Sequence, residues 1–267
     1  MSKYQEKECA SVRLIINADD FGLTESVSKG ILKGMQEGII TDTTMLTNTR
    51  HFDRSIELAK EAGIEAMGVH LNLTLLKPIL ESGKVQSIVD GKGNFYRKPS
   101  LIPSTFHKGE VRAELRAQIE KFLSSGLTLT HIDTHHGFSV MHAEMFQIIL
   151  ELAKEYRVPM RKDDVLTDDP FIKSQLAESG VKTTDVLCAD FSVPIMQESV
   201  LINTIAKYKQ TNATIEIPCH PGFVDDELRT ISSLNDEREE DLQLLLKQEW
   251  LGYMKEQGIE LISFSQL

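Results

Sequence analysis

Short apolar segments and amphipathic helical segments alternate along almost the whole chain, from residue 12 to residue 264. The apolar segments are short and rich in β-branched residues, as strands are, and hydrophobic residues at helical spacing lie between them. Such alternation predicts a parallel sheet whose strands are joined by crossover helices. The expected strands are 12–16, 41–46, 66–73, 129–136, 158–161, 184–187, 213–217 and 259–264, and the expected helices are 25–38, 53–62, 110–124, 143–156, 171–179, 196–208 and 236–257.

Seven or eight such units follow one another without a linker, so we expect them to close into a (β/α) barrel of mainly parallel strands. A chain of 267 residues can bury one large core, and we treat 1–267 as a single domain. Periodicity is weak across 75–108, which contains Pro78, Pro99 and Pro103. We expect this segment to overhang the site at the strand ends and shape its pocket, with a hairpin near Asp90.

Composition narrows the class of partner and the compartment. The net charge is 29 minus 40, or −11, which argues against a nucleic-acid or anionic-membrane partner. Cys9, Cys188 and Cys219 are far apart and form no CxxC pair, as expected for reduced thiols. The N-terminus is polar, and no apolar run approaches the roughly 20 residues of a membrane span. We therefore expect a cytoplasmic protein.

Two adjacent carboxylates, Asp19 and Asp20, follow the first expected strand. In a continuing strand they would point to opposite faces, but where the chain turns at Phe21 and Gly22 both can reach one cleft. Adjacent carboxylates are costly unless positive charge lies beside them. The pair is therefore either a solvated turn or part of a site that holds a cation.

Histidines occur at the ends of three later strands: His70, His135 and His220. The carboxyl ends of barrel strands meet at one face, where catalytic groups gather. Two imidazoles and one carboxylate can hold a divalent metal and leave positions for water and substrate. Each histidine alone is more often structural, so it is their shared position at strand ends that predicts a metal site.

Four motifs, in their order along the chain, resemble the YdjC/ChbG family of carbohydrate deacetylases. They are Asn17-Ala18-Asp19-Asp20-Phe21-Gly22, Gly68-Val69-His70-Leu71, Thr130-His131-Ile132-Asp133-Thr134-His135-His136 and Cys219-His220-Pro221-Gly222-Phe223. The similarity runs from the first strand to the last helix and includes residues 38–44. It implies a distorted barrel, a bound divalent metal and removal of acetyl groups from N-acetylated sugars such as chitooligosaccharides. It also implies a fold and site similar to those of the NodB-type polysaccharide deacetylases.

Carried over residue by residue, the resemblance implies that Asp20, His70 and His135 are the metal ligands. It further implies that Asp19 is the general base and His220 the general acid. The reaction would be metal-assisted amide hydrolysis, in which Asp19 takes a proton from the attacking water and His220 protonates the departing sugar amine.

One stretch departs from the family pattern. Family members continue the His135-His136 stretch with alternating histidines, whereas this chain has Gly137-Phe138-Ser139 and its next histidine is His142. The departure leaves the roles of His136 and His142 open and could alter substrate choice.

Two further residues are candidates for supporting roles. Asp133 lies two residues before His135, so it could orient a ligand or tune a histidine, or it could cap a loop. Arg161, at the end of an expected strand, either contacts the substrate or neutralises an active-site acid. His131 and His136 are expected to be structural.

Other functions remain open at this stage. The same residues could serve a metal-dependent hydrolase of a phosphoester or of a non-sugar amide, because the fold alone does not separate these reactions. A non-catalytic sugar-binding protein is a further alternative, although binding needs neither Asp19 nor His220 as proton-transfer groups. Two histidines favour a transition metal such as Zn²⁺, while the resemblance permits Mg²⁺. It also makes a homodimer plausible.

Overall fold

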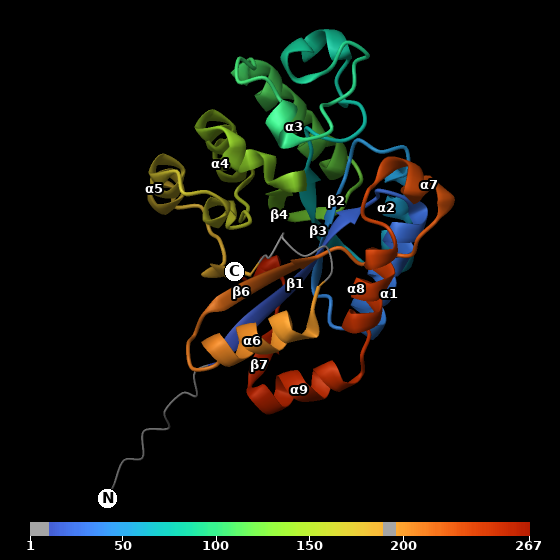
Figure 1. The fold of residues 1–267 in the computed structure, drawn as a ribbon, viewed down its shortest axis with the longest axis vertical. Helices are drawn as coiled ribbons and strands as arrows, with labels where there is room; N and C mark the ends of the chain where they lie inside the picture. The colour runs from blue at the N-terminus through green and yellow to red at the C-terminus, as the bar shows by residue number, and fades with distance from the viewer. Residues whose placement is uncertain (1–10, 189–195) are drawn as a thin grey trace, which may run out of the picture.

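The computed structural model describes residues 11–188 and 196–267, whose strands form one seven-stranded sheet (Figure 1). The strand order is β4-β3-β2-β1-β6-β5, β7 pairs with the beginning of β1, and every pairing is parallel. The predicted α/β architecture of mainly parallel strands is confirmed. The sheet curls into a half-barrel. The strands are β1 (Val12–Phe21), β2 (Asp42–Met45), β3 (Ala66–Leu71), β4 (Thr128–Thr134), β5 (Val186–Leu187), β6 (Thr214–Cys219) and β7 (Ile259–Leu261).

The expected strand at 158–161 is reduced to a single bridge beside β4. Met160 pairs with Ile132, and the amide of Arg161 donates to the Ile132 carbonyl at 3.0 Å. Pro159 has no N–H group, so this short segment cannot extend the ladder. On its other side the Met160 amide donates to the carbonyl of Lys182 at 3.0 Å, which partly closes the wall between β4 and β5.

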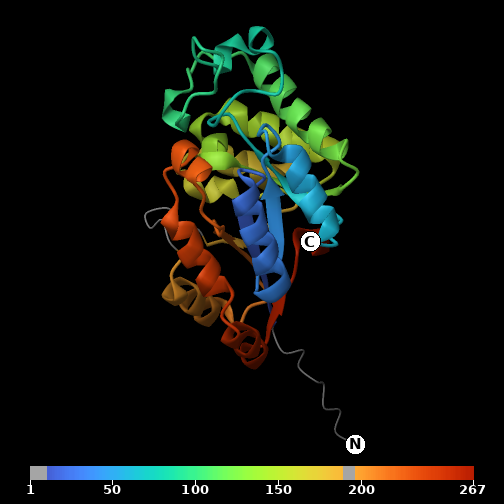
Figure 2. The same ribbon diagram turned by 90° about the vertical axis from the view of Figure 1, so that its right-hand side faces the viewer.

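Helices cover the outside of the sheet, as Figures 1 and 2 show. The first begins where predicted: the Thr24 hydroxyl caps it by accepting from the Val27 amide, and Gly38 follows its end. No helix within the described ranges has the length and apolarity that a membrane crossing requires. The helices are α1 (Glu25–Glu37), α2 (Phe52–Glu61), α3 (Lys108–Leu123), α4 (Ala143–Tyr156), α5 (Pro170–Ser179), α6 (Glu198–Tyr208), α7 (Asp226–Ile231), α8 (Asp236–Leu245) and α9 (Glu249–Gln257).

The expected helix at 236–257 is two helices, α8 and α9. Although residues 246–248 contain no glycine or proline, the chain bends there, and carbonyl groups at the end of α8 accept hydrogen bonds from outside that helix. The Leu244 carbonyl accepts from the buried indole of Trp250 at 2.8 Å, and the Leu245 carbonyl accepts from the Ile39 amide at 3.2 Å. Burial of Trp250 across the bend therefore outweighs helix continuity.

The long connection between β3 and α3 contains three short 3₁₀ helices: Ser82–Lys84, Gln86–Ile88 and Pro99–Leu101. Val89 and Phe95 pair in an antiparallel bridge around Asp90, which confirms the expected hairpin. The segment is anchored on α3, because the Glu114 carboxylate accepts from the amides of Ile79 and Leu80. In Figure 1 the segment accordingly sits over α3.

The interior of the half-barrel is filled from the C-terminal end of the chain. The Phe264 ring stacks on the buried His131 at 3.8 Å between centroids, and the Phe264 amide donates to Asp42 at 2.8 Å. Gly68 leaves room for this histidine, since a Cβ there would lie 2.5 Å from His131 Cε1. His131 is therefore structural, as predicted, and burial lowers its pKa to about 3.

Candidate active site

A bulge at the end of β1 turns Asp19 and Asp20 toward the same region. Asp20 has a φ of 70°, and the pairing of β1 with β2 shifts register between Ala18 and Phe21. A left-handed residue breaks the strict alternation of side chains, and aspartate tolerates this conformation better than most residues. The turn thus begins one residue earlier than the sequence indicated, and both carboxylates reach one site.

Asp20, His70 and His135 lie together at the ends of three strands. His135 Nδ1 lies 3.0 Å and His70 Nε2 3.5 Å from Asp20 Oδ1, and one ligand atom from each residue falls within 4.8 Å of the others. All three side chains are buried. Asp20 Oδ1 has no hydrogen-bond partner among the described residues, although it is buried. An unsatisfied carboxylate oxygen facing two imidazoles is what a divalent cation requires.

Asp133 supports His70 from behind. Its Oδ1 lies 2.7 Å from His70 Nδ1, and its Oδ2 accepts from the Thr44 hydroxyl at 3.1 Å. Burial alone would lower the pKa of His70, but Asp133, Asp19 and Asp20 raise it to about 9. The site therefore attracts a cation, and the bond to Nδ1 leaves His70 Nε2 directed toward Asp20 as a carboxylate-supported metal ligand would be.

Asp20 has a second partner that sequence reasoning missed. Arg238, from α8, is 2 % exposed, and its Nη2 donates to Asp20 Oδ2 at 2.7 Å. Burial would raise the pKa of Asp20, but His135 and Arg238 hold it well below its usual range. Asp20 is therefore ionised, with one oxygen fixed by Arg238 and the other directed toward the histidines.

Asp19 is held by Arg161, which lies beside it at the base of the site. The guanidinium donates to Asp19 through two nitrogens, at 2.8 and 2.7 Å, and also reaches Asp133 and Glu216. Burial would raise the pKa of Asp19, but Arg161 holds it well below its usual range. Of the two roles considered for Arg161, the structure therefore places it against an active-site acid.

His220 reaches the site from the loop after β6. Its amide donates to Asp241 Oδ2 at 3.0 Å, and its Nε2 lies 3.9 Å from Asp19 Oδ2. The loop packs closely on α1, because a Cβ on Gly30 would lie 2.6 Å from Gly222 Cα. Burial lowers the pKa of the His220 imidazole, while Asp19 and Asp20 act against that shift.

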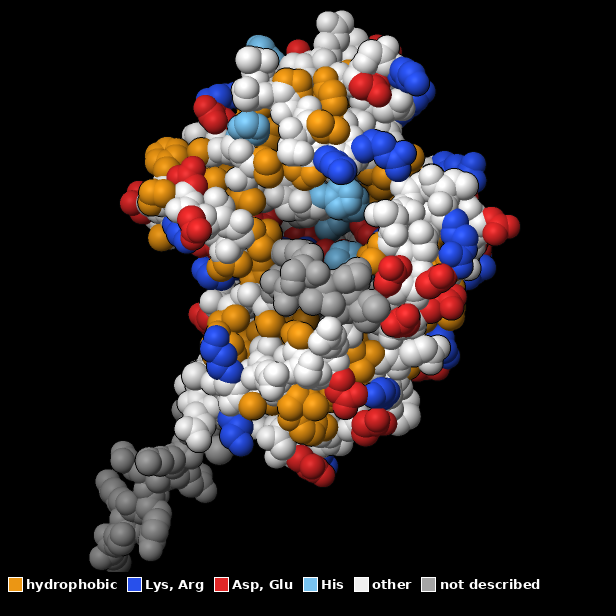
Figure 3. Space-filling model, in the orientation of Figure 1, with side chains coloured by type: hydrophobic (Ala, Val, Ile, Leu, Met, Phe, Trp, Pro, Cys, Tyr) orange, Lys and Arg blue, Asp and Glu red, His pale blue; other side chains and the backbone are white. Residues whose placement is uncertain are grey.

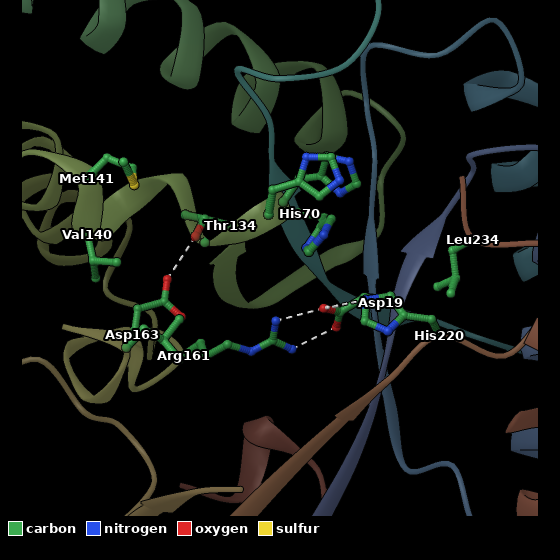
Figure 4. Close-up of a pocket in the computed structure, with 13 residues that line it drawn as sticks. Asp19, His70, Thr134, Val140, Met141, Arg161, Asp163, His220 and Leu234 are labelled. Atoms are coloured by element: carbon green, nitrogen blue, oxygen red, sulfur yellow. Dashed lines mark hydrogen bonds and ion pairs between the residues drawn. The ribbon is translucent and has the colours of Figure 1, made fainter. Parts of the chain in front are cut away.

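These groups open into a cavity of about 510 Å³. Figure 3 shows histidine side chains in this hollow, and Figure 4 places Asp19 and Arg161 at its base with His220 on one side. The described residues that line it are Asp19, His70, Thr134, His135, His136, Gly137, Val140, Met141, Arg161, Asp163, Leu166, His220 and Leu234. The volume is typical of a small-ligand site.

Residues 75–108 do not line this cavity, so the expectation that they shape its pocket was wrong. No residue of that segment belongs to the lining, because its turns are anchored on α3 instead. Thr74, just before it, contributes indirectly: its hydroxyl lies 3.1 Å from His136 Nδ1.

The structure gives His136 and His142, whose roles the sequence left open, different positions relative to the cavity. His136 lines the cavity at a φ of 59°, with its ring 3.8 Å from that of His135, and burial lowers its pKa to about 3. His142 precedes α4 and lies against Phe106, outside the described lining.

All seven predicted site residues therefore lie around one cavity or directly behind it. Sequence reasoning missed Thr44, Asp163, Glu216 and Arg238. A charged residue inside the apolar run 215–217 was a signal for Glu216. Arg238 lies in a run of charged residues at 236–240, and nothing there distinguishes it from a solvated helix face.

Comparison with known proteins agrees with the motifs. The model of the YdjC-like protein family matches residues 13–256. A carbohydrate deacetylase of Clostridium beijerinckii is 34 % identical over 256 residues, covering 96 % of this chain and all of the relative. A carbohydrate deacetylase of Brevibacillus brevis is 34 % identical over 259 residues with the same coverage.

Comparison with solved structures finds a close relative and more distant proteins that share only the fold. A crystal structure from Enterococcus faecalis V583, provisionally named a cellobiose-phosphate cleavage protein, has a TM-score of 0.88 and 32 % identity, covering 96 % of this chain and 98 % of the other. The Xyl-CE4 domain of a xylanase from the hindgut metagenome of Trinervitermes trinervoides has a TM-score of 0.50 and 10 % identity, covering 96 % and 89 %, a likeness of fold alone. With its four motifs on one site and the family model spanning most of its length, the chain belongs to the YdjC-like protein family.

Proposed function

We propose that this chain hydrolyses the acetamido group of N-acetylated sugars, releasing acetate and leaving a free amine on the sugar. The observation that carries the proposal is that Asp19 and His220 face one cavity beside the Asp20, His70 and His135 cluster. A hydrolase needs such a pair of proton-transfer groups, whereas a binding protein does not. The names of the relatives, carbohydrate deacetylases, support the substrate class.

Asp20, His70 and His135 would hold one divalent metal, Mg²⁺ or Zn²⁺. The orphaned Asp20 Oδ1 and the support of His70 by Asp133 fit such an ion. When bound, the metal supplies Lewis-acid chemistry, since it stabilises negative charge on the acyl oxygen and makes water more acidic.

Asp19 would accept the proton of the attacking water. Arg161 keeps this carboxylate ionised and fixes both of its oxygens, so its orientation does not have to be reached during the reaction. The same ion pair makes Asp19 a weaker base. Arg161 therefore fixes the orientation of Asp19 and at the same time lowers its proton affinity.

His220 would give a proton to the departing amine. With a lowered pKa its imidazole is neutral at pH 7, so it must first take up a proton. Its Nε2 lies 3.9 Å from Asp19 Oδ2, which gives the proton accepted by Asp19 a short path to the leaving group. Amide nitrogen leaves poorly unless it is protonated, so this transfer is required for the reaction.

The cavity suits a short, uncharged sugar such as a chitooligosaccharide. Among its described lining residues, Arg161 is the one Arg or Lys, and carboxylates already occupy its guanidinium. A phosphate group would find no unpaired Arg or Lys side chain among these lining residues. Free Cys188 and Cys219 support a reducing, cytoplasmic location.

One assay separates the candidate reactions. Acetate release is measured from N-acetylglucosamine oligomers with added Mg²⁺, added Zn²⁺ or a chelator, in parallel with phosphate release from a sugar phosphate. We expect metal-dependent acetate release and no phosphate release. Phosphate release alone would favour a phosphoester hydrolase, and neither product would favour a sugar-binding protein.

A further inference from the structure

Asp163 is a buried carboxylate on the cavity wall that the hydrolysis does not use. It begins a short 3₁₀ helix, Asp163–Leu166, and is 1 % exposed. Its Oδ2 accepts from the hydroxyls of Thr134 and Ser139, at 2.8 and 2.6 Å. Its Oδ1 accepts no hydrogen bond from any residue in the described ranges. One oxygen is therefore fixed, and the other is available to the cavity that Asp163 lines.

Asp163 has no cation partner in the described part of the chain, although Arg161 is two residues away. The Asp163 amide donates to the Arg161 carbonyl at 2.8 Å, and the two side chains extend in different directions from this tight turn (Figure 4). The guanidinium is directed to Asp19, while Asp163 is directed to Thr134. Burial raises the pKa of Asp163 to about 6, so this position has a cost in stability. A buried acceptor held without a cation calls for a ligand that donates hydrogen bonds.

Apolar side chains accompany Asp163. Val140 and Met141 lie on its side of the cavity in Figure 4, and Leu166, at the end of the same 3₁₀ helix, is also part of the lining. Met141 is 42 % exposed and belongs to the lining, so its side chain is accessible to a ligand. A sugar ring combines hydroxyl donors on its edge with C–H groups on its face, and this wall offers one acceptor beside an apolar surface.

We propose that Asp163 is a specificity residue, whose Oδ1 accepts a hydrogen bond from one hydroxyl of the substrate sugar while Val140, Met141 and Leu166 cover the face of the ring. The inference rests on the proposed function and defines its substrate class as amides that carry a sugar hydroxyl. Ser139, which fixes Asp163, belongs to the stretch in which this chain departs from the family's histidine pattern. The departure thus has a structural consequence at the substrate wall.

The test measures sugar affinity rather than turnover. Titration calorimetry with N,N′-diacetylchitobiose and its single-deoxy derivatives is done on the metal-loaded protein in a His220→Ala background, which slows hydrolysis. Asp163→Asn keeps the shape and can still accept from Thr134 and Ser139, and Asp163→Ala removes the acceptor altogether. Asp164→Asn is the matched control, because Asp164 faces Lys162 at 3.7 Å and is not part of the lining.

We expect both Asp163 variants to weaken binding by about 10- to 100-fold, the usual effect of losing a hydrogen bond to a charged group, with Asp164→Asn within about two-fold. One deoxy derivative should bind the parent weakly but lose nothing further in Asp163→Ala. Unchanged affinity in the Asp163 variants, additive losses for every derivative, or no sugar binding by the parent would each overturn the inference. A wild-type protein that binds the sugar but releases no acetate would overturn the proposed function, while the affinities still decide the role of Asp163.

Discussion

Arg161 and Asp19 form a two-pronged ion pair beneath the cavity, with both carboxylate oxygens bonded at 2.8 and 2.7 Å. The same guanidinium lies 2.9 Å from Asp133 Oδ2 and 2.6 Å from Glu216 Oε1. One buried cation thus serves three carboxyl groups. Burial raises the pKa of Glu216 to about 8 against the effect of Arg161, which favours the neutral form of this third group near pH 7 and reduces the crowding of charge.

Replacing Arg161 should therefore cost far more than replacing Glu216. Arg161→Met leaves Asp19 and Asp133 as buried charges without their cation, and the free energy of unfolding should fall by about 3–5 kcal/mol. Glu216→Gln replaces a neutral acid by a neutral amide of the same shape and should change it by less than about 1 kcal/mol. Urea denaturation at pH 7 measures both. Equal losses would mean that Glu216 is ionised.

Asp42 should make the fold less stable as pH rises. Burial raises its pKa from 3.8 to about 7, despite hydrogen bonds from the amides of Phe264 and Thr43. A carboxyl whose folded pKa is raised contributes stability below its unfolded pKa, and this contribution is lost as pH rises through the folded value. Between about pH 4 and pH 7, the wild type should lose up to about 1.4 kcal/mol per pH unit relative to Asp42→Asn, which cannot ionise.

Urea denaturation at several pH values between 4 and 8 checks this slope. The exposed Asp168, which pairs only with Lys173 among the described residues, provides the control, and Asp168→Asn should follow the wild type. A difference between wild type and Asp42→Asn that stays constant across the range would show that Asp42 ionises normally.

The metal cluster predicts a clear result for metal content. His70→Ala/His135→Ala should lose the divalent metal, because Asp20 alone is too few ligands. His142→Ala should retain it, since that ring lies against Phe106 at 5.4 Å rather than in the cavity. Elemental analysis of the purified proteins gives the answer. Equal metal in the wild type and the double variant would remove the site.

The proton-transfer roles predict different responses to the leaving group. Asp19→Asn should reduce turnover by ~10²–10⁴ while the metal is retained. His220→Ala should slow amide substrates strongly and an aryl acetate much less, because a phenolate departs without protonation. Rates on both substrates with metal content measured in parallel are needed. Metal loss in Asp19→Asn would make Asp19 a ligand, and equal slowing of both substrates would make His220 an orienting or oxyanion-stabilising residue.

The site residues that could be predicted all follow the ends of strands. Parallel strands end at the same edge of a sheet, so Asp19, His70, His135 and His220 could be brought together from strand ends alone. The pairing of Asp20 with Arg238 joins positions 218 residues apart, and no local pattern marks it. Such partners are set by how helices pack on the sheet, which periodicity does not specify.

The errors in the fold have a similar origin. The sequence between α8 and α9 predicts a continuous helix, but a bond from the Ile39 amide to the Leu245 carbonyl and the Trp250 indole bonded to Leu244 stabilise a bend. The segment 75–108 lacks periodicity, yet carboxylates of α3 accept hydrogen bonds from its backbone, and none of its residues is among the described lining of the cavity. The position of this loop depends on which acids of α3 its amides reach, and the sequence alone does not specify those pairings.

The packing of Phe264 inside the half-barrel has a consequence for how the chain folds as it is synthesised. β1 carries the first site residues and is translated well before β6 and β7, with which it pairs. The amide of Phe264 then closes onto Asp42, 222 positions away. Until β6 and α8 have been synthesised, the two carboxylates of β1 have β2 beside them but lack β6 and Arg238. The complete site can therefore form only after β6 and α8 have been synthesised, and until then one edge of the apolar β1 strand lacks its neighbour and is prone to aggregation.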